Sequence, residues 1–138
     1  MKCPRCHDRL ELEILGRPTG ESLGPYRSLI SLTPENQPVR LDTCERCGGT
    51  WFDAGETLAV ARLQGRADDW ADGFAVLEME DYLRLDCPRC AVAMTKVRSL
   101  SNRKIYYDVC AGCRGMWFDT HEVRLLLAAA EDMSRLDR

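Results

Sequence analysis

Apolar and polar residues alternate along two short stretches of this 138-residue chain, residues 10–15 and 104–110. An alternation of period two is typical of a strand with one buried face. The apolar positions of the two alternations are Leu10, Leu12 and Ile14 in the first and Ile105, Tyr107 and Val109 in the second. The sequence Ser-Asn-Arg before the second stretch can turn a hairpin. The pattern therefore predicts short antiparallel hairpins.

A helical period replaces this alternation in the last part of the chain. From about residue 120 to 136, apolar residues recur at spacings of three and four, which predicts a helix. A shorter helix is predicted from about 54 to 65, where a glycine ends it. Three apolar residues of segment 66–86 also fall at helical spacing among many acidic residues: Trp70, Phe74 and Leu77. This segment is predicted to be a further helix or an acidic connector.

The eight cysteines all belong to Cys-x-x-Cys pairs. The four pairs are Cys3/Cys6, Cys44/Cys47, Cys87/Cys90 and Cys110/Cys113. Two thiolates from one tight turn, a metal knuckle, can bind the same ion, and two knuckles complete a four-cysteine zinc site. Disulfides would suit a small secreted protein, but we expect no secretory signal before position 3 and a cytoplasmic location, which favours metal. We predict two Zn²⁺ ions per chain.

The spacing of the pairs divides the chain into two units. Nineteen residues separate the last two pairs, as in known four-cysteine zinc sites, whereas 37 separate the first two. The 18 extra residues fall in segment 16–38, which is rich in Gly, Pro and Ser and is either a flexible excursion or an arm that orders on a partner. We expect a first unit at 1–65, an acidic connector at 66–86 and a second unit at 87–138.

A second motif repeats together with the cysteines. Residues 48–56 read Gly-Gly-Thr-Trp-Phe-Asp-Ala-Gly-Glu and residues 114–122 read Arg-Gly-Met-Trp-Phe-Asp-Thr-His-Glu, at a constant offset of 66. The spacing Asp-x-x-Glu before a helical pattern is typical of a capping box, and each tryptophan is expected to cover the metal site and pin the helix to it. The residues of this junction are Trp51, Asp53, Glu56, Trp117, Asp119 and Glu122. Gly49 and Gly115 are expected to need a left-handed backbone.

Together these residues resemble the TFIIB-type zinc-ribbon family of small, mostly bacterial proteins. The family pattern is Cys-Pro-x-Cys, a hairpin, Cys-x-x-Cys-x-Gly-x-Trp-x-Asp and a Glu that starts a helix, and this chain fits it twice in tandem, over about residues 3–64 and 87–136. The resemblance implies that all eight cysteines are zinc ligands. It also implies a small metal-stabilised α+β fold of two zinc ribbons, each a short antiparallel hairpin joined by metal knuckles and followed by a helix. It implies little about activity.

The charge of the chain weakens the nucleic-acid role that a ribbon suggests. The formal net charge is −3, and two four-thiolate zinc centres would bring it to about −7, whereas phosphate-binding modules carry a basic excess. One local exception is the basic and aromatic hairpin at Arg103, Lys104, Tyr106 and Tyr107, which could stack single-stranded bases. A solvated hairpin with one tyrosine buried is the simpler interpretation.

The remaining charged residues near the knuckles are interpreted without a catalytic role. Four arginines in or beside the knuckles are expected to offset thiolate charge: Arg5, Arg46, Arg89 and Arg114. His7 and His121 are expected to be surface histidines rather than ligands.

These features together indicate a binding module. A four-cysteine site leaves no open position on the metal, so we expect structural zinc, no enzyme activity and no small-molecule substrate. No apolar run reaches the length of a membrane span. The sequence at 123–130 is more apolar than one small ribbon can cover, which favours a protein partner or self-association. Nucleic-acid binding is the first alternative, and redox sensing through zinc release is the second.

Overall fold

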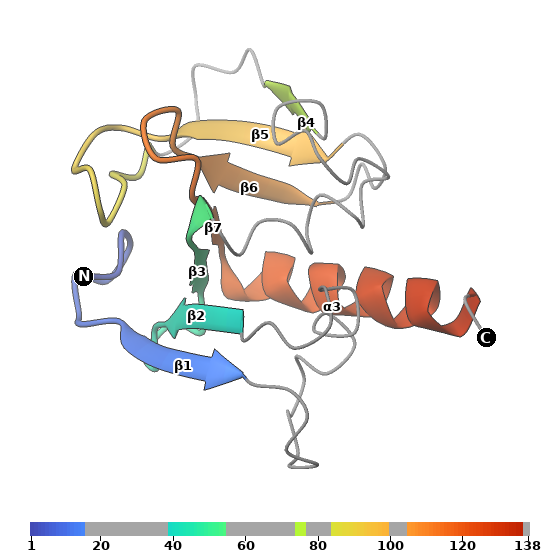
Figure 1. The fold of residues 1–138 in the computed structure, drawn as a ribbon. Coiled ribbons are helices and arrows are strands. Elements are labelled where there is room, and N and C mark those ends of the chain that lie inside the picture. The colour runs from blue at the N-terminus through green and yellow to red at the C-terminus, as the bar shows by residue number, and fades with distance from the viewer. Residues whose placement is uncertain (16–38, 55–73, 77–83, 100–104, 137–138) are drawn as a thin grey trace.

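The computed structural model describes residues 1–15, 39–54, 74–76, 84–99 and 105–136. Within these residues the chain forms seven strands and one helix (Figure 1). In chain order they are β1 (Glu11–Leu15), β2 (Val39–Thr43), β3 (Thr50–Phe52), β4 (Phe74–Val76), β5 (Thr95–Ser99), β6 (Tyr106–Val109), β7 (Met116–Phe118) and α3 (Thr120–Leu136). No helix in this part of the chain is long and apolar enough to cross a membrane.

The seven strands form one antiparallel sheet in the order β1-β2-β3-β7-β6-β5-β4. We call β1–β3 with their two knuckles the first ribbon, and β4–β7 with theirs the second ribbon. In Figure 1, β1 and β2 lie on one side of the central strands β3 and β7, and β4, β5 and β6 lie on the other. The predicted antiparallel hairpins are confirmed, and they share one continuous sheet.

The central pairing relates the two copies of the repeat by a local twofold axis. Strands β3 and β7 pair antiparallel with Trp51 opposite Trp117. The flanking pairs are Thr50–Phe118 and Phe52–Met116. Equivalent positions of the two copies differ by 66. Each flanking pair therefore joins the residue before the tryptophan in one copy to the residue after the tryptophan in the other copy. The two ribbons therefore meet within one chain as the subunits of a symmetric dimer meet.

Alternation along β3 and β7 sends their tryptophans and phenylalanines to opposite faces of the sheet. On one face, Trp51 and Trp117 lie in a buried cluster with cysteines of both ribbons. On the other face, Phe52 and Phe118 meet edge to face with ring centroids 5.4 Å apart, and Tyr107 stacks on Phe118 at 4.8 Å. All five aromatic rings are buried. The two ribbons thus share aromatic packing on both faces of the sheet.

Both strand predictions are confirmed, but Leu12 in the first stretch is exposed rather than buried. In the second ribbon, Ile105, Tyr107 and Val109 are buried as the alternation predicts. Leu10, directly before β1, is buried, but Leu12 within β1 is 54% exposed. The reason is that β1 is the last strand of the sheet, and no element of the described residues covers Leu12.

The prediction of a C-terminal helix is confirmed over its whole length, from Thr120 to Leu136. The helix begins directly after Asp119, whose backbone carbonyl accepts a hydrogen bond from the Val123 amide at 2.8 Å. Residues 55–65 of the shorter helix expected at 54–65, and the insertion at 16–38, lie outside the described residues.

The prediction of a helix in segment 66–86 is wrong for residues 74–76, because these residues form strand β4. This strand pairs antiparallel with β5, and Phe74 lies opposite Ser99. Phenylalanine and valine favour strands, and the edge of β5 offers unpaired backbone groups, so strand pairing overrides the helical spacing of this segment. Trp70 and the rest of the expected acidic connector up to residue 83 lie outside the described residues.

The two adjacent tyrosines of β6 give a matched test of this aromatic packing. Replacing Tyr107 by Ala should lower the free energy of unfolding of the zinc-loaded protein by about 3–5 kcal/mol, because it leaves a cavity beside Phe118. Tyr106→Ala should change that free energy by less than about 0.5 kcal/mol, because this side chain is exposed. Denaturant unfolding followed by circular dichroism measures both. Equal losses for the two variants would contradict the shared aromatic packing.

Candidate metal centres

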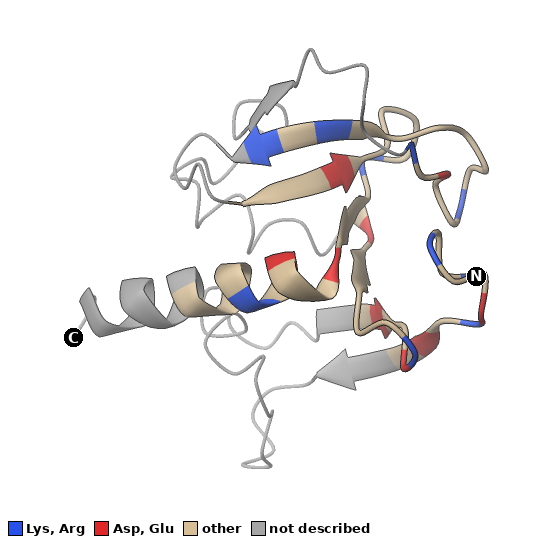
Figure 2. Ribbon diagram, turned by 180° about the vertical axis from the view of Figure 1, so that it is seen from behind, with Lys and Arg blue, Asp and Glu red and all other residues tan. Residues whose placement is uncertain are grey.

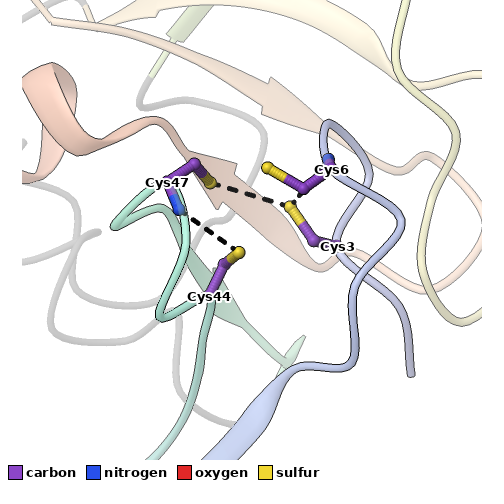
Figure 3. A group of neighbouring side chains, drawn as sticks. All are labelled: Cys3, Cys6, Cys44 and Cys47. Atoms are coloured by element: carbon purple, nitrogen blue, oxygen red, sulfur yellow. Dashed lines mark hydrogen bonds between the residues drawn. The ribbon is translucent and has the colours of Figure 1, made fainter.

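The first group of four cysteines gathers two knuckles of the first ribbon. It consists of Cys3 and Cys6, in the turn before β1, and Cys44 and Cys47, in the turn between β2 and β3. Their sulfur atoms all lie within 4.8 Å of one another and point into one space (Figure 3). The Sγ atoms of Cys3 and Cys47 are 3.7 Å apart.

The second group repeats this arrangement in the second ribbon. Cys87 and Cys90 lie in the turn before β5, and Cys110 and Cys113 lie in the turn between β6 and β7. The four sulfur atoms again lie within 4.8 Å of one another, and the Sγ atoms of Cys87 and Cys113 are 3.7 Å apart. The predicted division of the cysteines into two groups is therefore the one that the fold produces.

All four knuckles have the same backbone. The residue after the second cysteine has a left-handed conformation in each: His7 (φ 61°), Gly48 (φ 76°), Ala91 (φ 58°) and Arg114 (φ 64°). The amide of that residue donates to the carbonyl of the first cysteine, for example Gly48 to Cys44 at 2.8 Å. The left-handed position is thus one residue before Gly49 and Gly115, so the role predicted for these two glycines is wrong.

Backbone amides also donate to the sulfur atoms. The amide of the second cysteine of each pair lies 3.3–3.5 Å from the Sγ atom of the first. Burial raises the pKa of Cys47 and of Cys87 to about 12. Burial also acts to raise the pKa of Cys44 and Cys110, but amide donors and neighbouring thiols bring it below the ordinary thiol value. The second knuckle of each ribbon therefore stabilises negative charge on its first thiolate, Cys44 or Cys110.

The two groups fit tetrahedral zinc. Four thiolates about 2.3 Å from one Zn²⁺ ion lie about 3.8 Å from one another, close to the observed 3.7 Å. A disulfide would bring two sulfur atoms to about 2.05 Å, and all eight cysteines are free. With four sulfur donors each, the sites leave no position on the metal for water or substrate. His7 and His121 are exposed and belong to neither group.

Each tryptophan ring lies against the knuckle of the opposite ribbon. A methyl group on Gly49 would overlap the ring of Trp117, and a methyl group on Gly115 would overlap the ring of Trp51. The carbonyl of Gly49 in turn accepts the amide of Cys44 at 3.0 Å. The glycines are therefore required because the opposite indole leaves no room for a side chain. The tryptophans do lie beside the cysteines, as predicted, but across the twofold axis.

The aspartate of the second copy binds an arginine of the first. Asp119 accepts a bidentate pair of hydrogen bonds from the guanidinium of Arg5, with Nη2 2.8 Å from Oδ2, and a further bond from Trp117 Nε1 at 3.0 Å. Burial acts to raise the pKa of Asp119, but these donors bring it below the ordinary carboxyl value. The same ion pair raises the pKa of Arg5.

The aspartate of the first copy makes the reciprocal contacts. Asp53 accepts a bidentate pair from Arg89, with Nη2 2.7 Å from Oδ2, and a bond from Trp51 Nε1 at 2.9 Å. Arg5 and Arg89 are the third residues of the two Cys-Pro-Arg-Cys knuckles. Each ribbon therefore holds a knuckle arginine of the other through its own aspartate.

The capping-box interpretation is corrected by these contacts for the second copy of the junction. Asp119 occupies the position before the helix, but its carboxylate binds Arg5 and Trp117. The Glu122 carboxylate accepts the Tyr106 amide at 3.1 Å, and Glu56 lies outside the described residues. The aspartate instead binds an arginine of the opposite ribbon. The spacing of residues within one copy cannot reveal this contact. The repetition of arginine in both Cys-Pro-Arg-Cys knuckles was the available signal.

A buried aspartate lies opposite each tryptophan in the sheet. Asp42 pairs with Trp51 in β2 and β3, and Asp108 pairs with Trp117 in β6 and β7. Burial raises the pKa of both carboxyls. Lys96 binds Asp108 at 3.0 Å, whereas the residue opposite Asp42 in β1 is Leu12 rather than a cation. The sequence analysis assigned no role to this pair.

The hairpin residues considered for nucleic-acid contact divide into two groups. Tyr107 is 1% exposed and stacks on Phe118, so its ring is closed to bases and this prediction is wrong for it. Tyr106 is 36% exposed. Arg103 and Lys104 lie outside the described residues.

A pocket of about 530 Å³ lies between the first knuckles of the two ribbons. Its lining includes Lys2, Pro4 and His7 from one side and Arg84, Asp86 and Pro88 from the other. Because both ribbons line it, the pocket depends on the pairing of β3 with β7.

Comparison with known proteins agrees with this architecture. The family model described as transcription factor zinc-finger, of the TFIIB zinc-ribbon type, matches residues 32–62 and 86–129, more than half of the chain. The second match spans all four cysteines of its ribbon, whereas the first contains only Cys44 and Cys47. No curated protein and no solved structure matches the chain. The two matched segments support two tandem copies.

Two aspartates that bind arginine give a matched test of the cross-ribbon contact. Asp119→Ala should lower the free energy of unfolding by about 1–3 kcal/mol, because it leaves the indole N–H of Trp117 without its acceptor. Asp8→Ala should cost less than about 1 kcal/mol, because Asp8 and Arg46 are an exposed pair at 3.4 Å. Both variants should bind zinc at the wild-type stoichiometry when zinc is saturating. A smaller loss for Asp119→Ala than for Asp8→Ala would contradict the assignment.

Proposed function

The chain belongs to the transcription factor zinc-finger family, and we propose that it is a non-enzymatic double zinc-ribbon module that binds a partner protein. Each group of four cysteines holds one Zn²⁺ ion, which supplies folding free energy to a small core. The closed coordination of such sites supports a structural rather than a catalytic role for the metal.

The observation that favours a protein partner is that several basic side chains form ion pairs within the chain. Arg5, Arg89 and Lys96 each form an ion pair with an aspartate of this chain, and Arg46 pairs with Asp8. In Figure 2 the basic bands of the described sheet lie on β5 beside an acidic band on β6, and basic and acidic segments are mixed in the loops. A phosphate backbone is bound by unpaired cations along one face. The charge pattern therefore supports a protein partner.

The helix α3 offers a face for this partner. Val123 and Leu126 point inward and are buried, whereas Leu125 and Leu127 are half-buried and Ala128 is exposed. Half-buried leucines beside exposed alanine form an apolar surface that a partner can cover.

Nucleic-acid binding is the competing function, and the exposed ring of Tyr106 favours it. It predicts that Arg103 and Lys104 supply the contacts and that binding weakens steeply with added salt.

Affinity capture from the native host, before and after nuclease treatment, tests the proposal. Leu125→Glu should abolish capture of the partner, because the interface would have to bury an unpaired charge. Arg124→Gln changes the net charge by the same amount at an exposed position of α3 and should leave capture intact. Arg103→Ala with Lys104→Ala should also leave it intact.

The opposite pattern would contradict a protein partner. Capture that disappears on nuclease treatment, or that depends on Arg103 and Lys104 but not on Leu125, assigns the module to nucleic acid.

A further inference from the structure

We propose that the two metal centres bind zinc as one cooperative pair, because each four-cysteine group is held in place by side chains of the opposite ribbon. The proposal rests on the structural zinc of the proposed function and is independent of the identity of the partner. It assigns a new role to the repeated Trp-x-Asp motif: this motif completes the neighbouring metal centre rather than its own.

The first coupling between the two ribbons is steric. The Gly49 carbonyl accepts the Cys44 amide and closes the second knuckle of the first ribbon. The ring of Trp117, from the second ribbon, packs directly on Gly49. The Trp117 ring of β7 therefore restrains the closed form of this knuckle. The twofold axis repeats the contact for Gly115 and the ring of Trp51.

The second coupling concerns the other knuckle of each ribbon. Arg5 lies between Cys3 and Cys6, so its side chain is fixed to the turn that presents these two thiolates. Asp119 holds the Arg5 guanidinium from the end of β7. Folding of the second ribbon therefore restrains the first knuckle of the first ribbon. Arg89 and Asp53 do the same in the other direction.

The third coupling concerns the core. Both tryptophans lie in one buried cluster with cysteines of both centres. The cysteines of this cluster, counted with those packed on its edge, are Cys3, Cys6, Cys44, Cys47, Cys87, Cys110 and Cys113. Neither ribbon thus has an apolar core of its own on this face of the sheet. An ion that orders one centre also orders the groups that the other centre needs, which is positive coupling between the two binding events.

Native mass spectrometry of the metal-free chain titrated with zinc tests the coupling. If the centres were equal and independent, about half of the molecules would hold one ion at one equivalent of zinc. The cooperative pair predicts that metal-free and two-zinc molecules dominate at that point, with the one-zinc species far below half. At saturation all molecules should hold two ions. A one-zinc population of half or more at one equivalent would overturn the proposal.

Two glycines of the knuckles provide a matched pair of variants. Gly49→Ala pushes a methyl group into the ring of Trp117, whereas a methyl group on Gly112 would make only ordinary contacts, 3.6 Å from Cys110 Sγ and 3.7 Å from Cys90 Sγ. Zinc release to a chromophoric chelator should be at least tenfold faster for both ions in Gly49→Ala and unchanged in Gly112→Ala. Faster release of a single ion, with the other at the wild-type rate, would overturn the coupling.

A milder variant keeps the test decisive if Gly49→Ala does not fold. Asp119→Asn preserves the shape of the side chain but weakens its hold on Arg5, and it should raise the one-zinc population at one equivalent of zinc above that of the wild type. An unchanged one-zinc population would contradict the role proposed for the Arg5–Asp119 ion pair in coupling the two centres. Two ions bound independently would overturn this proposal while leaving structural zinc and partner binding intact.

Discussion

The packing of each tryptophan on a glycine of the opposite ribbon is the contact on which the rest of this structure depends. It requires the antiparallel pairing of β3 and β7 in the one register that places Trp51 opposite Trp117. It also requires a residue without a side chain two positions after Cys47 and after Cys113, which are Gly49 and Gly115. A slip of this register by one residue would send one of the two indoles to the other face of the sheet. The repeat thus encodes an interface.

Charge and metal chemistry build on this interface. The tryptophan N–H groups orient Asp53 and Asp119, and the oriented carboxylates bind Arg89 and Arg5 across the axis. These arginines extend from the knuckles that present the first thiolates of each centre. A small sheet with short strands has little apolar area to bury, so metal centres and shared aromatic rings together supply the stability that the strands alone lack. The ribbons form one unit because neither could complete its core alone.

The sequence predicts the local features of this architecture well. Cys-x-x-Cys pairs define metal knuckles because the ligand chemistry is contained in four residues, and the helix after Asp119 follows from a long periodic pattern. Features that depend on distant partners could not be predicted in this way. The spacing Asp-x-x-Glu has the same appearance in a capping box and in a cross-ribbon ion pair, and only the fold brings Arg5 to Asp119. The strand at 74–76 likewise depends on an available edge of β5 that no local pattern reveals.

Nuclear Overhauser effects in the zinc-loaded protein test the central contact most directly. The account predicts cross-peaks between the Gly49 α-protons and the outer ring protons of Trp117, and the reciprocal peaks between Gly115 and Trp51. Both sets should appear together, because one local axis relates them. Cross-peaks from each glycine only to the tryptophan of its own ribbon, Gly49 to Trp51 and Gly115 to Trp117, would contradict the exchange of contacts between the two ribbons.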